Sequence, residues 1–410
     1  MRPYRLFALV AGAALALSSP GADAADAALP GAIHGPGPLS CVLELSGRDA
    51  SGNTVLQTVA YALDRPGLVL APLSTAAPGL SRWQRLQAAP DPLLSGPAAA
   101  GVNSAGPPSG AAGAIEVTEI LLEDPGRDLL LLRAPGLGAC EAGVPGAAPA
   151  PAAGDTLIGI RNRDGYRSRV YRALLDRAFP TLGGPDVLRI RIPDGGGAGS
   201  GFLLDSRRRL VGSILPPPPG ADRLFACAVP VDRGEIDAAA ARPGRPLLAA
   251  PPAAPPPAGD FTRTPAGLLA QALLLTRDDQ ADRALRLLDE AGRLSGESDV
   301  LLMERGTWRF RIGRTEAAIQ DFARAAALNP RLLLAHFNMG VALGTTGRYA
   351  EAADALTRAL SIDPYNAPAH YHLALALAAA QRPDQARREY ERLWLLDAGL
   401  ARDLGALLKF

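Results

Sequence analysis

Cysteine, lysine and histidine are scarce in this 410-residue sequence, which limits the chemistry that it can support. Its three cysteines and four histidines include no Cys-x-x-Cys pair and no Cys/His cluster, so we predict no metal site and no cofactor. Lys409 is the only lysine, and its position near residue 410 excludes a serine–lysine catalytic dyad in the rest of the chain.

The sequence also lacks an excess of charge of either sign. It has 42 basic and 41 acidic residues and a formal net charge of +1. Without a basic surplus there is no electrostatic attraction for nucleic acid or for an anionic membrane, so neither is an expected partner.

Long apolar runs are missing as well. The apolar segment LFALVAGAALAL is too short to span a bilayer, and it lies between the basic residues MRPYR and the small residues Ala22, Asp23 and Ala24. This order predicts a secretory signal peptide over residues 1–24, hence a periplasmic or secreted bacterial protein without a membrane anchor after cleavage. In an oxidising compartment, Cys41, Cys140 and Cys227 would supply one disulfide and one buried thiol, with the pairing left open.

Two regions with different patterns follow. Residues 39–241 contain many short apolar runs separated by Gly, Pro and Asp, which is typical of an all-β domain. Residues 86–114 are of low complexity and are expected to form a long insertion between strands. The Pro- and Ala-rich residues 242–260 are expected to link this domain to a second one.

From Pro265 onward a period of 34 residues appears, with repeats starting at Pro265, Asp299, Leu333 and Ala367. Small residues occupy the eighth, twentieth and most of the twenty-seventh offsets and large residues the twenty-fourth, as two closely packed antiparallel helices require. The segment HFNMGVALGTTGRYAEAADALTRALSIDP (336–364) resembles the tetratricopeptide repeat (TPR). The resemblance implies an all-α TPR solenoid over residues 265–410, with four repeats and a capping helix at 399–410.

The TPR resemblance also implies a groove that binds a protein or peptide, lined by the first helix of each repeat. Phe337 and Tyr371 fit this groove and fit packing between repeats equally well, while Asn338 and His372 flank the apolar row, His372 towards solvent. The offsets assign these residues to partner binding: Met303, Phe310, Phe337, Asn338, Val341, Tyr371, His372 and Leu375. Thr307 and Leu334 occupy further groove-facing offsets.

The β region resembles a different family. Four segments occur in the order expected for chymotrypsin-fold serine proteases of the bacterial Deg/HtrA type: DPGRDLLLLRA (124–134), AAGDTLIGI (152–160), GGGAGSGFLLDSRRRLVGSIL (195–215) and FACAVPVDRG (225–234). The resemblance implies a double β-barrel over residues 39–241, with Asp128 at the position of the triad aspartate. The whole chain would then be a multidomain protein, an all-β chymotrypsin-like double barrel followed by an all-α TPR solenoid.

The other two triad positions depart from the family pattern. GLVLAPLST (67–75) stands where the family has GLVLTNAHV, so Ser74 replaces the histidine. GAGSGFLLD (197–205), aligned without gaps to GNSGGPLLD, places Gly199 at the nucleophile and Ser200 one residue later. A shift of one residue turns a side chain to the other face of a strand.

The sequence therefore predicts a non-enzymatic, exported protein in which a degenerate protease barrel is tethered to a partner-binding TPR groove. The alternative is a divergent serine endopeptidase that uses Ser200, with substrates recruited by the repeats; only His34, in the leader, could then serve as its base. A third possibility is that the barrel keeps the old substrate cleft as a peptide-binding pocket. The sequence names neither the partner nor the oligomeric state.

Overall fold

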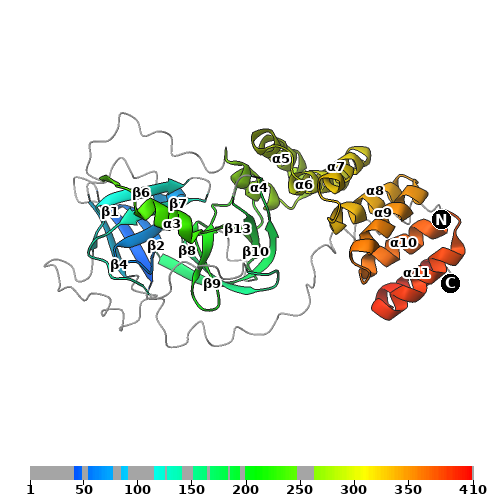
Figure 1. Cartoon of the computed structure of the whole chain (residues 1–410), viewed down its shortest axis with the longest axis horizontal. Coiled ribbons are helices and arrows are strands. Elements are labelled where there is room, and N and C mark those ends of the chain that lie inside the picture. Colours follow the sequence, from blue (N-terminus) through cyan, green and yellow to red (C-terminus); the bar gives the residue numbers. More distant parts are fainter. Residues whose placement is uncertain are drawn as a thin grey trace. The chain divides into compact units, whose positions relative to one another are not determined.

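The computed structural model describes two compact units, one that ends at Thr276 and one that starts at Arg277 (Figure 1). In its described residues the first unit contains β-strands and three helices, and the second unit is helical. Residues 1–24, where the signal peptide is predicted, lie outside the described residues. The described residues are 41–48, 54–76, 85–90, 115–124, 127–140, 151–163, 167–182, 185–193, 199–246 and 263–408.

The first group of strands forms an eight-stranded antiparallel sheet in the order β14-β6-β7-β3-β2-β1-β4-β5. Its central strands β3 and β7 are almost wholly buried, which explains why LVLAP and LLLLR are continuous apolar runs rather than alternating ones. The strands are β1 (Val42–Arg48), β2 (Thr54–Ala62), β3 (Leu68–Pro72), β4 (Arg85–Pro90), β5 (Ile115–Glu116), β6 (Glu119–Asp124), β7 (Leu129–Arg133) and β14 (Arg245–Pro246).

The second group of strands closes into a six-stranded barrel in the order β10-β13-β12-β11-β8-β9. The strands are β8 (Thr156–Arg163), β9 (Arg167–Phe179), β10 (Val187–Arg191), β11 (Gly201–Leu204), β12 (Leu210–Ile214) and β13 (Phe225–Pro230). The region predicted to be all-β, residues 39–241, is thus β-rich in its described residues, with one sheet and one closed six-stranded barrel.

Strand β11 belongs to two hydrophobic cores at once. Phe202 and Leu204 pack in the core of the first sheet, whereas Leu203 packs inside the barrel with Leu157 and Ile190. Because successive side chains of a strand point to opposite faces, a strand between two cores must be apolar at every position. That requirement accounts for the run GFLL after the glycine-rich loop.

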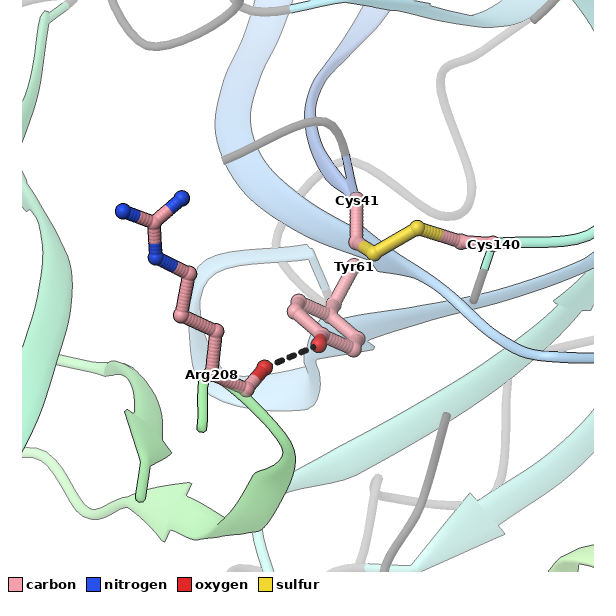
Figure 2. The surroundings of a disulfide bond; sticks show 4 residues. All are labelled: Cys41, Tyr61, Cys140 and Arg208. Carbon is pink, nitrogen blue, oxygen red and sulfur yellow. Dashed lines mark hydrogen bonds between the residues drawn. A yellow bond between two sulfur atoms is a disulfide. The ribbon is translucent and has the colours of Figure 1, made fainter. Parts of the chain in front are cut away.

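One disulfide and one hydrogen bond connect distant segments of this unit (Figure 2). Cys41 and Cys140 form a disulfide with their Cα atoms 5.6 Å apart, and Cys227 is a buried free thiol, as the cysteine count predicted. The Tyr61 hydroxyl on β2 donates a hydrogen bond of 3.0 Å to the carbonyl of Arg208, in the turn between β11 and β12. The Tyr61 ring also lies 5.9 Å from the Phe202 ring.

Helix α4 (Pro265–Leu273) belongs to the first unit, where it packs against strand β10 of the barrel (Figure 1). The Asp222 N–H donates to the carbonyl of Leu274 at 3.1 Å, and the Cys227 thiol lies 3.6 Å from the Ala270 carbonyl. The helix starts at the predicted first repeat, but nearly all its residues are buried and apolar, so it needs cover on several sides.

The helical unit follows the 34-residue period predicted from the sequence. Helices begin at Asp299, Leu333 and Ala367, where the repeats were predicted to start. The elements are η5 (Asp278–Gln280), α5 (Ala281–Ser295), α6 (Asp299–Arg311), α7 (Thr315–Leu328), α8 (Leu333–Thr345), α9 (Tyr349–Ile362), α10 (Ala367–Ala379), α11 (Pro383–Leu396) and α12 (Ala398–Leu408). The last of these takes the place of the predicted capping helix.

Glycines allow the two helices of a repeat to approach closely. A Cβ on Gly306 would lie 2.6 Å from the Phe322 ring, and a Cβ on Gly340 would lie 2.6 Å from Leu356. The eighth and twenty-fourth offsets are therefore in direct contact, as the repeat pattern predicted. The turn between the helices requires a positive φ, which is 81° at Gly313, 85° at Gly347 and 58° at Gln381.

Candidate functional site

The predicted triad positions lie on three segments of the β unit that meet through the main chain. Ser74 is in the short helix α2 (Leu73–Ala76), directly after β3. The N–H of Leu73, at the start of this helix, donates a hydrogen bond of 3.0 Å to the carbonyl of Asp128. Asp128 precedes β7, is 1% exposed and has a positive φ of 54°. The first two predicted positions are thus brought together.

The third segment is the start of β11. Gly199 and Ser200 immediately precede this strand, and Ser200 is only 6% exposed. The Ser213 hydroxyl on β12 lies 3.5 Å from the carbonyl oxygens of both Asp128 and Gly201. It connects the Asp128 turn to β11, the strand that directly follows Ser200. The sequence alone gave no reason to single out Ser213, although it lies in the quoted segment 195–215.

The hydroxyl groups described beside helix α2 cannot activate a serine. The Thr58 and Thr75 hydroxyls are hydrogen-bonded at 2.8 Å, and Thr75 also donates to the Pro72 carbonyl. A hydroxyl has no basicity near neutral pH, and the sequence from residue 41 to residue 276 contains neither histidine nor lysine. His34, the remaining candidate for a base, lies outside the described residues.

The first helices of the repeats bring the predicted partner-binding residues into one cluster. These residues come from three helices: Met303 and Phe310 from α6, Phe337, Asn338 and Val341 from α8, and Tyr371, His372 and Leu375 from α10. The apolar members all belong to the hydrophobic core of this unit or pack against it. Thr307, Phe310 and Leu334 are half-buried, whereas the other members of the predicted set are buried: Met303, Phe337, Asn338, Val341, Tyr371, His372 and Leu375.

His372 differs from the expectation that it faces solvent. It is 2% exposed, and its ring makes edge-on contacts with Phe337 at 5.6 Å and Tyr371 at 5.4 Å between centroids. Burial lowers the pKa of His372 to about 4, so the imidazole is neutral near pH 7. The expectation was wrong because α10 is buried over nine consecutive residues, and no flank of it is left for solvent.

A charged cluster in the last repeat was missed by the sequence reasoning. His370 on α10 is 4% exposed and lies between a carbonyl oxygen and the carboxylate of Glu389 on α11. Glu389 also accepts a hydrogen bond of 2.8 Å from Arg392. The available signal was a histidine at the fourth offset of a repeat, with an acidic residue at the twenty-third offset of the same repeat.

A second buried carboxylate, Asp321 on α7, is neutralised by two arginines on α6. Arg305 and Arg309 each approach it to 2.7 Å. Burial acts to lower the pKa of Arg305, but the hydrogen bonds and the charges of Asp321 and Asp289 raise it above the usual value. This network joins the two helices of one repeat and has the character of a structural ion pair.

No group of three or more His, Cys, Asp or Glu side chains within the described part of the chain is placed to hold a metal ion. None of the helices within it combines the length and the apolar composition needed to cross a membrane.

Comparison with known families identifies the helical unit. Two tetratricopeptide repeat models match this chain, one over residues 303–367 and the other over residues 345–408. The repeats of this unit are therefore TPRs, as the sequence predicted, within the 106 residues that the two models span together. None of the curated proteins searched matches the chain.

Solved structures similar to this chain include two of MamA and one of YrrB. The crystal structure of MamA is 22% identical and covers 34% of this chain and 82% of its own, with a TM-score of 0.32. MamA from Desulfovibrio magneticus RS-1 is 17% identical, and the match covers 34% of this chain and 81% of the MamA chain, with a TM-score of 0.32. YrrB, described as a TPR protein with an unusual peptide-binding site, is 19% identical. The match covers 36% of this chain and 77% of the YrrB chain, with a TM-score of 0.33.

Proposed function

We propose that this protein is an exported, non-enzymatic binding protein, in which the TPRs hold a protein partner and the β unit is a degenerate serine-protease domain. The observation that carries the proposal is the uncharged cluster of first-helix residues on α6, α8 and α10. Its buried members, such as Phe337 and Tyr371, are held rigidly by packing, so a partner does not have to order them. The half-buried Phe310 and Leu334 supply apolar surface for contact.

The degenerate protease reading of the β unit rests on the three converging segments. Helix α2, the Asp128 turn and the start of β11 meet through the Leu73 and Ser213 hydrogen bonds, which is the convergence that a catalytic triad needs. Their side chains include no histidine or lysine that could serve as the base of a triad or dyad. A serine without a positioned base is a poor nucleophile, and the burial of Ser200 argues further against the endopeptidase alternative.

Export to the periplasm or the extracellular medium is the proposed location. The predicted signal peptide over residues 1–24 is one support, and the Cys41–Cys140 disulfide is another. Structural disulfides persist in oxidising compartments and are rare in the bacterial cytosol. No cofactor, nucleic acid or membrane surface has a role in the proposed function.

The proposal is tested by capturing partners on the immobilised full chain from an envelope extract. Phe310→Ser removes the half-buried aromatic side chain of the first-helix cluster and should abolish retention of the partner. Leu328→Ser is the matched control, because Leu328 is an exposed apolar residue on a second helix, α7. Retention of the same proteins by all three forms, or of none by the wild type, would contradict the proposal.

A further inference from the structure

A cavity of about 500 Å³ opens in the last two repeats, between α9, the start of α10 and α11. Its walls are mostly apolar, and Leu360, Leu373 and Leu396 contribute to them. Two further lining residues form an accessible apolar rim: Tyr365 is 78% exposed and Leu395 is 88% exposed. None of these residues belongs to the first-helix cluster, so the cavity is a separate site from that of the proposed function.

The polar part of the cavity includes His370, Glu389 and Arg392. Nδ1 of His370 lies 2.7 Å from the Glu389 carboxylate and Nε2 lies 3.0 Å from the Pro364 carbonyl. Because both partners are acceptors, the ring satisfies both only as an imidazolium, which donates from each nitrogen. Glu389 also pairs with Arg392. When His370 is protonated, two cations share one carboxylate, which leaves an excess of one positive charge.

The preceding repeat shows that this charge is a special feature of the last one. His336 occupies the same offset and likewise contacts the carbonyl of Pro330 at 3.0 Å. Ala355 stands at the offset of Glu389, and among the described residues Nδ1 of His336 has no hydrogen-bond partner. The ion cluster is therefore an addition to the repeat and is not needed to build it.

Arg392 has donors available for a ligand. Its side chain is 61% exposed, and one of its five N–H groups is used in the bond from Nη1 to Glu389. The remaining N–H groups can form the two parallel bonds that an arginine makes with a carboxylate. Leu395 and Leu396 follow three and four residues later on α11, so they stand about one helical turn from the guanidinium.

We propose that this cavity binds the C-terminal end of a partner polypeptide whose last residue is bulky and apolar. The terminal carboxylate pairs with Arg392, and the last side chain enters the cavity against Leu360 and Leu373. In a C-terminal residue both groups leave the same Cα, which matches the spacing of about one turn between the guanidinium and the apolar wall. The apolar rim at Tyr365 and Leu395 extends beyond the cavity, where the preceding residues of a peptide would lie.

Fluorescence anisotropy with the full chain tests the proposal. The probe is a fluorescein-labelled pentapeptide, Ser-Gly-Ala-Leu-Phe, with a free C-terminal carboxylate, and the same peptide as a C-terminal amide is the paired probe. The free acid should bind at least tenfold more tightly than the amide. Arg392→Gln should weaken the free acid about tenfold and leave the amide unchanged, since it removes the paired cation and little packing.

Arg358→Gln is the matched control. Arg358 has the same offset one repeat earlier, on α9, is exposed and does not line the cavity. It should bind both peptides like the wild type. Equal affinity for acid and amide, equal losses in the two variants, or no binding by the wild type would overturn the proposal. Binding of decanoate without binding of the peptide would also overturn it, in favour of a fatty acid. A first-helix variant such as Phe310→Ser should leave the peptide affinity unchanged.

Discussion

Gly340 on α8 and Leu356 on α9 are so close that a Cβ on Gly340 would lie 2.6 Å from the Leu356 Cγ. The same Cβ would lie 3.1 Å from the Ala352 carbonyl, which is main chain and cannot move easily. We expect Gly340→Ala to destabilise the helical unit by about 1–2 kcal/mol, because the steric cost exceeds the gain in helix propensity of about 1 kcal/mol. The thermal midpoint of the helical circular dichroism signal measures the change.

Gly292 on α5 provides the matched control. It is also a glycine within a helix, but a Cβ there would have no atom nearer than 4.0 Å. Gly292→Ala should therefore raise the midpoint, by the equivalent of about 1 kcal/mol. Equal shifts in the same direction for both substitutions would show that the close approach of α8 and α9 is not present.

Gln381 is predicted to be a site of removable strain. It has a φ of 58° in the turn where the preceding repeats have Gly313 and Gly347. Side chains other than glycine are disfavoured in this region, so Gln381→Gly should stabilise the helical unit by about 0.5–1 kcal/mol. Gly347→Ala should have the opposite effect, and a midpoint that falls in the Gln381 variant would be evidence against the positive φ.

The pair of His370 and Glu389 should make the stability of the helical unit depend on pH. The hydrogen bond to Glu389 is the largest cause of the raised pKa of His370. A raised folded pKa contributes stability that is fully present below the unfolded pKa of about 6.5 and is lost as pH rises through the folded pKa. The thermal midpoint should therefore decline above about pH 6.5, and Glu389→Gln should reduce that decline.

His372 should make the stability of the helical unit depend on pH in the opposite direction to His370, so the two contributions can be measured separately. Its pKa is lowered to about 4 by burial, so its contribution is present above about pH 6.5 and is lost as pH falls towards 4. Glu389→Gln should retain this loss on the acid side. A variant that altered the acid side alone would refute the assignment of the two histidines.

Thiol counting tests the cysteine assignment. Burial raises the pKa of the Cys227 thiol to about 12, and the side chain is completely buried. In the native chain we expect no reaction with a thiol reagent at pH 8, because both access and thiolate are lacking. One thiol should react after unfolding without a reductant, and three after reduction. Three reactive thiols without reduction would contradict the Cys41–Cys140 disulfide.

The repeats were the most predictable part of the molecule. Their helix starts at Asp299, Leu333 and Ala367 follow from the period because each repeat must place a small residue opposite a large one. The assignment of α4 was less secure from the same pattern, since an apolar helix can be covered by a barrel as well as by a repeat. The position of a residue within a repeat also does not show how much of its helix is buried by neighbouring helices. For this reason the sequence pattern wrongly predicted that His372 faces solvent.

The candidate site of the β unit could be predicted only in part. The sequence identified Ser74, Asp128 and Ser200 through aligned segments, but the burial of Ser200 depends on tertiary packing around β11. The partner of Cys41 could not be deduced, because pairing is decided by which strands become neighbours. The cluster of His370, Glu389 and Arg392 joins residues from two helices, and a single-sequence pattern does not show which of them meet.

Fluorophosphonate labelling tests most directly whether this protein acts by binding rather than by catalysis. The purified full chain and a Ser200→Ala variant would be treated with the probe beside an active serine protease, and labelled protein would be measured by mass spectrometry. We predict no labelling of either form, because Ser200 is buried and its unit contains no histidine or lysine in its described residues. Labelling of the wild type that disappears in Ser200→Ala would contradict this account and establish Ser200 as a nucleophile.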